Sequence, residues 1–428
     1  MRQNRTVTVD FGMSYEEYIA LHDNTGWFLK RVVVVMQLVM LSMHSEECTL
    51  SHRYTRHSTR ERVIICLRKG PVMIPISQIR CVECRTVFTV MPSFMVRYKH
   101  YEIHLAQALL ENNLISNVSY RFQQRLFESL TGSTAGGTPM TLWRLMKWLG
   151  HSTTVTSLLM KLGLTPPTTF QEDEKFVSEA GQQTYIAALF HADLIWHIDY
   201  LHSTDERSLT ASLLRYKETI ERDQPGYAPE SVTMDSHAAS QSAVANVFPS
   251  SPIQECLLHA QRNVNKDLAT YRRRQPEVQP EFLESIGSGT WSALTTSRSE
   301  EEFCGRIRKL KESTNGDPLL NSRLDKLILR HKMLMQYLKT PSVDTTSTNL
   351  DQSFKWLNRK FFQMQSFMTE EGAKAFSNAW AIARDMWRFM KDAKKAGESP
   401  VELAGADLRG RGWLEVVNLV VAGVFIQA

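Results

Sequence analysis

Hydrophobic and polar positions in the second half of the chain follow a pattern that predicts a sheet with helices packed against it. Between the third and fourth predicted strands, apolar positions recur at helical spacing over 208–222, and a second helix is expected before Phe248-Pro249. The strands themselves are predicted from short apolar runs at 170–173, 184–190, 193–201, 231–234 and 253–258. The order strand, strand, strand, helix, strand indicates a mixed α/β domain.

The rest of the chain is patterned mainly as helices, with one β-rich stretch near the N-terminus. Apolar runs at 63–67 and 72–76 flank the turn Arg68-Lys69-Gly70-Pro71 and predict a hairpin. Thr138 and Pro139 mark a helix start, because threonine caps the first turn and proline fits it. These changes divide the chain into N-terminal helices at 1–43, a β-rich module at 44–100, a helical region at 101–165, an α/β domain at 168–400 with a helical insertion at about 260–340, and a tail at 401–428.

Length and composition fit a multidomain globular protein. The 428 residues suffice for two or three domains, and 43% hydrophobic with 22% charged residues is ordinary for a soluble chain. The apolar runs 32–41 and 416–426 are shorter than the about 20 residues that cross a bilayer, so no membrane association is expected. Six scattered cysteines indicate reduced thiols in a cytoplasmic protein, because a disulfide framework would place them more densely.

Positive charge is concentrated in the β-rich module. Residues 44–100 contain ten lysines and arginines against four glutamates, whereas the whole chain has a net charge of only +5. A local basic surface is typical of proteins that bind nucleic-acid phosphates. Trp143 and Trp148, in the helix that starts at Pro139, are predicted to be core residues. The cations expected to contact DNA lie in the module and in this helix, and they are Arg80, Arg85, Lys99, Arg144 and Lys147.

The same module carries a set of metal-ligand side chains. Cys81 and Cys84 form a CxxC motif, whose two thiolates on a tight turn bind zinc well. Cys48 and His52 supply a second pair upstream, and His44 is an alternative to His52. The pattern predicts a Cys₃His zinc site with the hairpin between its two halves.

Three aspartates far apart in the chain are the main candidates for catalysis. Asp173 and Asp235 each end a predicted strand, and Asp351 lies at the start of a predicted helix. Mg²⁺ and Mn²⁺ prefer carboxylate ligands, and clustered carboxylates repel one another unless cations hold them together. Two such ions about 3.5–4 Å apart can activate a nucleophilic oxygen and stabilise a leaving oxygen in phosphodiester chemistry.

Asp199 competes with Asp173 for the role of first carboxylate, because it follows a strongly apolar strand. Only 36 residues separate Asp199 from Asp235, whereas 62 residues separate Asp173 from Asp235 and include two further strands and a helix. A sheet that brings the first and fourth strands side by side therefore favours Asp173, with Asp199 as the alternative.

Several segments resemble bacterial insertion-sequence transposases of the DDE/DDD type. The ribbon around Cys81-Val82-Glu83-Cys84 looks like their N-terminal zinc-ribbon module, and Cys256 with His259 matches a CxxH landmark. Two departures from the family pattern are Ser51, which stands in place of a cysteine, and Ser236-His237, which stands in place of Gly-Trp. The segments that look like the three acidic motifs are 173–187, 227–235 and 346–351.

The resemblance implies an α+β multidomain protein in which a zinc-ribbon-like module and helix-turn-helix-like helices precede an RNase H-like core with a helical insertion. It implies that Asp173, Asp235 and Asp351 hold Mg²⁺ or Mn²⁺, with His259 nearby, for strand cleavage and transfer at the ends of a mobile element. The implied partners are element-end and target DNA and further copies of the chain on that DNA, in the cytoplasm at the nucleoid. The alternative is a catalytically inactive DNA-binding protein, namely a decayed or domesticated transposase or a zinc-ribbon regulator.

Overall fold

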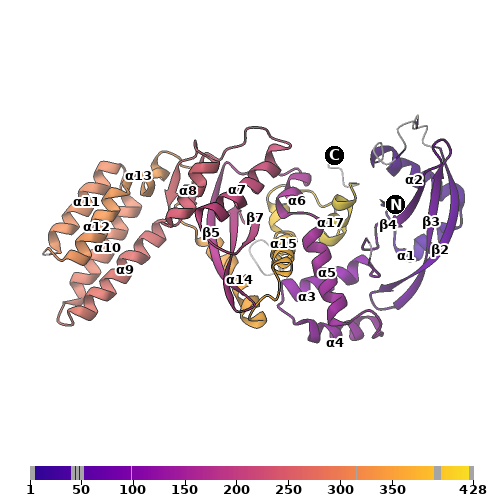
Figure 1. The fold of residues 1–428 in the computed structure, drawn as a ribbon, viewed down its shortest axis with the longest axis horizontal. Helices are drawn as coiled ribbons and strands as arrows, with labels where there is room; N and C mark the ends of the chain where they lie inside the picture. Colours follow the sequence, from indigo (N-terminus) through magenta and orange to yellow (C-terminus); the bar gives the residue numbers. More distant parts are fainter. Residues whose placement is uncertain are drawn as a thin grey trace. The chain divides into compact units, whose positions relative to one another are not determined.

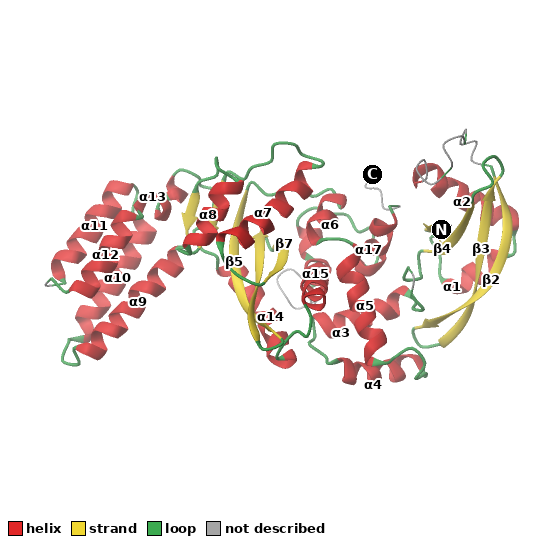
Figure 2. Ribbon diagram, viewed as in Figure 1, coloured by secondary structure: helices red, strands yellow, loops and turns green. Residues whose placement is uncertain are grey.

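The chain folds into two compact units, each built from a sheet and helices (Figure 1, Figure 2). The computed structural model describes residues 5–39, 44, 48, 53–97, 99–314, 316–389 and 397–423. Unit 1 contains residues 1–154, 158–164 and 378–428, and unit 2 contains residues 155–157 and 165–377. Both sheets are mixed, which agrees with the α+β class expected from the sequence. No described helix has the length and apolar character needed to cross a membrane.

Unit 1 begins with a four-stranded sheet in the order β1-β4-β3-β2. Strands β2 and β3 form the antiparallel hairpin expected from the sequence, while β1 pairs in parallel with β4. The sequence predicts only helices in residues 1–43, but β1 is a strand, because Val7 and Val9 complete the core of the sheet. Helices α1 and α2 then cover this core with Tyr18 and Phe28. The elements are β1 Thr6–Val9, α1 Tyr15–His22, α2 Thr25–Val39, β2 Tyr54–Cys66, β3 Gly70–Cys81 and β4 Val87–Pro92.

Helices make up the rest of unit 1. Helix α5 starts as the sequence predicts, with the Thr138 side chain accepting a hydrogen bond from the Thr141 amide. Asn418 of α17 donates to the carbonyls of Ser93 and Met95 and so ties the C-terminal helix to the segment after β4. The elements are α3 Ile103–Leu114, α4 Tyr120–Thr131, α5 Pro139–Ser152, α6 Val155–Lys161, α16 Pro400–Leu403 and α17 Trp413–Ala422.

The boundary between the units falls within α15, Glu370–Met386. The sequence places residues 168–400 in one domain, but the structure assigns residues from Asn378 onward to unit 1. Asn378 donates to the carbonyl oxygens of Gly150 and Thr153 at the end of α5, and Trp380 is fully buried. Contacts of this kind cannot be seen in the helical pattern, which continues through the boundary.

Unit 2 contains a five-stranded sheet in the order β7-β6-β5-β8-β9. The first three strands are antiparallel neighbours, and β5, β8 and β9 run parallel. Two helices, α7 Glu206–Glu221 and α8 Ala238–Val247, follow β7 and β8. The strands are β5 Thr169–Glu179, β6 Gln182–His191, β7 Leu194–Leu201, β8 Ser231–Met234 and β9 Ile253–Glu255.

A group of helices separates β9 from the last helices of unit 2 (Figure 1). Its helices enclose a separate hydrophobic core that includes Phe303, Ile307 and Leu334. After the insertion, α14 Thr348–Met364 returns to the sheet and contacts β5. The insertion helices are α9 Leu257–Arg274, α10 Pro280–Thr296, α11 Glu300–Ser313, α12 Pro318–Leu329 and α13 His331–Leu334.

Candidate active site

Strand β5 places Asp173 on the face of the sheet that α14 covers. Gln171, two residues earlier and therefore on the same face, accepts a hydrogen bond from the Leu350 amide of α14 at 3.3 Å. Glu174, one residue after Asp173, points to the other face, where its carboxylate accepts a hydrogen bond from Ser240 of α8. The sequence predicts that Asp173 ends its strand, but it lies within β5, because that strand continues to Glu179 in its pairing with β6.

Asp199 lies on the opposite face of the same sheet. Strand pairing aligns Glu174 with Ala187 and Ala187 with Asp199, and directly paired residues point to the same side. Asp199 forms an ion pair with Arg215 of α7, whose Nε lies 3.0 Å from the carboxylate. Asp199 is therefore engaged with α7 and does not share the α14 face with Asp173.

Asp235 and Asp351 lie near Asp173 on two other elements. Asp235 immediately follows β8, the parallel neighbour of β5, and its Oδ1 accepts a 2.7 Å hydrogen bond from the His237 amide. Asp351 lies in the first turn of α14. Burial and then the negative charge of Asp351 raise the pKa of the Asp173 carboxyl to about 7, with Asp235 adding to the shift and His259 opposing it. The three carboxylates thus share one electrostatic environment.

Cys256 and His259 join this environment at the start of α9. The sequence places Cys256 within a strand, but β9 ends at Glu255, and Cys256 is the N-cap residue of α9. Although burial alone would raise the pKa of the Cys256 thiol, hydrogen bonds from His259 and Ser347 lower it. The same hydrogen bond raises the pKa of His259 to about 9 against the effect of burial, helped by the charges of Asp173 and Asp235. His259 is thus held as a cation beside the aspartates.

Two further residues of the site are absent from the sequence prediction. Arg262, one turn after His259, places its Nη1 3.1 Å from Asp351 Oδ2 and 3.3 Å from His259 Nε2. Gln171 links β5 to the α14 amide described above and donates to Asp344 Oδ2 at 2.8 Å. The i, i+3 spacing of His259 and Arg262 on a helix was a usable signal, whereas nothing in the local sequence marks Gln171.

A second group of metal-ligand side chains lies at the end of the β2–β3 hairpin in unit 1. Within the described residues, His44, Cys48, Cys81 and Cys84 are the one set whose ligand atoms all lie within 4.8 Å of one another. His44 Nδ1 is 3.3 Å from Cys84 Sγ, and its Nε2 lies 3.0 Å from the Tyr54 hydroxyl. This Cys₃His set suits tetrahedral zinc, with the Tyr54 contact orienting the imidazole.

His44 thus takes the position for which the sequence offered both His44 and His52. His52 itself lies outside the described residues. The 4.8 Å limit also bears on Asp173, Asp235 and Asp351, all of which are described. These three aspartates do not form such a set. In at least one pair of them, the carboxylate oxygens are therefore more than 4.8 Å apart.

The cations predicted to contact DNA fall into two places in unit 1. Arg80 on β3 donates to His57 Nε2 at 3.0 Å, and Arg85, which has a positive φ of 58°, follows Cys84. Lys99, Arg144 and Lys147 instead line a common pocket. Trp143 and Trp148, predicted as core residues, are only partly buried and line the same pocket.

Comparison with known proteins adds a family match and a limited structural similarity. The model of the domain of unknown function DUF6431 matches residues 46–126, which include the hairpin, the CxxC motif and α3. No curated protein matches the chain.

Solved structures that are similar to this chain include those of Mos1 mariner transposase. Its catalytic domain is 12% identical over 44% of this chain and 94% of that chain, with a TM-score of 0.18. Its paired-end complex with Mn is 13% identical over 54% of this chain and 79% of that chain, again with a TM-score of 0.18. Similarity of this degree carries no information on function, which has to come from the geometry of the site.

Proposed function

We propose that unit 2 is a metal-dependent nuclease of the transposase type that cleaves and transfers DNA strands. The observation that carries the proposal is that Asp351, in the first turn of α14, and Asp235, after β8, lie close enough to Asp173 of β5 for both to raise its pKa. A cluster of this kind is costly by itself, because its carboxylates must ionise beside one another.

The donor set fits a hard divalent cation. Three carboxylates can hold Mg²⁺ or Mn²⁺, and such ions would neutralise the negative charge of Asp351 and Asp235, which adds to burial in raising the pKa of Asp173. Bound ions would activate the attacking oxygen and stabilise the leaving oxygen of a phosphodiester. His259 and Arg262 present positive charge from the first turns of α9, where they can bind the phosphate under attack. Gln171 holds the start of α14 against β5 and so fixes the position of Asp351.

Unit 1 would deliver the DNA. The His44, Cys48, Cys81 and Cys84 set would hold Zn²⁺ and fix the end of the hairpin. The proposed DNA contacts are those of Arg80, Arg85, Lys99, Arg144 and Lys147 with phosphates. Joining two element ends needs two active sites, so we propose that copies of the chain assemble on DNA at the nucleoid.

The test is nicking of supercoiled plasmid DNA that carries the sequences flanking the gene. We expect cleavage only with Mg²⁺ or Mn²⁺, and a loss of at least about 100-fold in Asp235→Asn, because a metal ligand is removed. Asp199→Asn is the matched control, since it makes the same change on the other face of the sheet, and it should keep its rate.

Two results would count against the proposal. Cleavage that persists in Asp235→Asn would place the chemistry elsewhere or reveal a contaminant. DNA binding by wild-type protein without cleavage under any divalent cation would favour the inactive DNA-binding alternative.

A further inference from the structure

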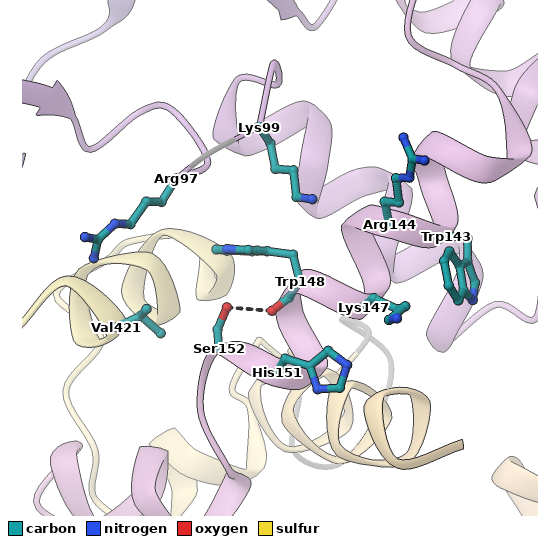
Figure 3. Close-up of a pocket in the computed structure, with 9 residues that line it drawn as sticks. All are labelled: Arg97, Lys99, Trp143, Arg144, Lys147, Trp148, His151, Ser152 and Val421. Carbon is teal, nitrogen blue, oxygen red and sulfur yellow. Dashed lines mark hydrogen bonds between the residues drawn. The ribbon is translucent and has the colours of Figure 1, made fainter. Parts of the chain in front are cut away.

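A pocket of about 700 Å³ in unit 1 combines positive charge with two partly buried tryptophans (Figure 3). Six of its residues come from α5, two from the segment after β4, and one from α17. The lining residues are Arg97, Lys99, Trp143, Arg144, Lys147, Trp148, His151, Ser152 and Val421. A volume in the range of about 300–1,000 Å³ is typical of sites for small organic groups.

The charge of this pocket favours an anion. Four lysine or arginine side chains line it, and none of its nine lining residues is acidic. Lys99 lies near Arg144: burial and then the charge of Arg144 lower the pKa of Lys99. Like charges gathered in this way are stabilised when a negatively charged group enters between them.

The tryptophans supply a second kind of surface. Figure 3 shows the Trp148 ring in the middle of the group, with Lys99 above it and His151 below it in this view. The Trp148 carbonyl accepts a 2.5 Å hydrogen bond from Ser152, and Lys147 Nζ lies 4.6 Å from the centre of the Trp143 ring. Because Lys147 already stacks on Trp143, Trp148 is the better platform for an aromatic ligand.

A DNA duplex fits this arrangement poorly. Its bases are stacked inside the helix, so a concave pocket meets only its phosphates and makes no use of a tryptophan ring. An unpaired nucleotide presents both a flat base and a phosphate, which are the two features that the pocket can bind.

We propose that this pocket binds an unpaired nucleotide of DNA, with the base stacked on Trp148 and the phosphate held by Lys99 and Arg144. The inference rests on the proposed DNA-strand function, since cleavage and transfer expose unpaired nucleotides at strand ends. It adds a site that distinguishes unpaired from duplex DNA and that is separate from the acidic site of unit 2.

The experiment measures binding of labelled short oligo(dT) and of a blunt duplex of equal length to the full chain, in EDTA. Stacking on an aromatic side chain is worth about 1–3 kcal/mol per base, which is about a fivefold to 150-fold change in affinity. We expect Trp148→Ala to weaken oligo(dT) binding within this range and to leave duplex binding unchanged. Trp148→Phe should keep most of the affinity, because it retains an aromatic ring.

Lys99→Gln and Arg144→Gln are a second test of the pocket. They keep Trp148, so they remain informative even if Trp148→Ala fails to fold. They should weaken oligo(dT) binding and reduce its dependence on salt. Equal oligo(dT) affinity in wild type and in the variants of Trp148, Lys99 and Arg144 would overturn the proposal.

The result is separable from the nuclease proposal. Asp235→Asn should bind oligo(dT) like wild type, since the assay contains no divalent cation. Nicking without Trp148-dependent oligo(dT) binding would remove only the pocket proposal. Trp148-dependent binding without nicking would remove only the nuclease.

Discussion

Replacing Asp173 by asparagine should make the protein more stable in the absence of divalent cations while abolishing its response to them. The substitution keeps the size of the side chain but removes a carboxyl group that ionises at a cost. Burial and the charge of Asp351 raise the pKa of this group from an ordinary 3.8 to about 7. The folded state therefore holds the proton more tightly than the unfolded chain, and stability is lost as pH rises through this window.

The size of the effect follows from the shift. Each unit of pKa corresponds to about 1.4 kcal/mol, so ionising Asp173 in the folded protein costs at most about 4 kcal/mol at pH 8. At pH 5 the same calculation gives about 1.5 kcal/mol. The advantage of Asp173→Asn over wild type should thus grow by about 2–3 kcal/mol between these pH values, as an upper limit, because neighbouring side chains can relax.

Urea unfolding followed by circular dichroism, in EDTA at pH 5 and pH 8, measures this difference. Added Mg²⁺ should raise the thermal midpoint of wild type at pH 8 and leave that of Asp173→Asn unchanged, because binding to the folded state alone stabilises it. Asp199→Asn is the control, and it should lose rather than gain stability, because it breaks the ion pair with Arg215. A difference between Asp173→Asn and wild type that does not grow with pH would show that Asp173 is not a buried carboxyl beside Asp351.

Three further predictions concern the zinc set, the α14 anchor and a buried lysine. Cys84→Ser should lower the zinc content measured by native mass spectrometry and the thermal midpoint of the protein, because one of four ligands is lost. Gln171→Ala should reduce Mg²⁺-dependent nicking by about tenfold to 100-fold with DNA affinity unchanged, since a displaced Asp351 would be poorly positioned. Lys360→Met should raise the free energy of unfolding by about 1–3 kcal/mol at pH 7, because burial lowers the pKa of this lysine to about 8. This last gain should disappear as pH rises from 8 toward 10.5, where the unfolded chain also loses the charge, and urea titrations over that range would detect it.

Local sequence was sufficient where one element carries its own signal. The β2–β3 hairpin follows from two apolar runs around a turn, and β8 has the predicted bounds Ser231–Met234. The start of α5 at Thr138-Pro139 is likewise a local property, because capping involves only the first turn of a helix. The Cys81–Cys84 motif gave half of a metal-ligand set for the same reason.

Prediction failed where the stabilising contacts are distant in sequence. β1 is a strand because β4, about eighty residues later, offers it a parallel partner. The unit boundary within α15 depends on contacts of Asn378 with the end of α5. Arg262 and Gln171 belong to the site because each contacts α14. Arg262 binds Asp351, 89 residues later, and Gln171 accepts a hydrogen bond from Leu350, 179 residues later.

The sequence by itself determined the β2–β3 hairpin, strand β8, the start of α5 and which side chains could ligate a metal. It left open whether Asp173 or Asp199 joins Asp235 and Asp351. Only the tertiary structure showed that these two aspartates lie on opposite faces of the sheet, since either face can be covered by a helix. Arg215 of α7 pairs with Asp199, whereas α14 contacts Gln171 on the Asp173 face. Contacts between residues so far apart in sequence are a property of the whole fold.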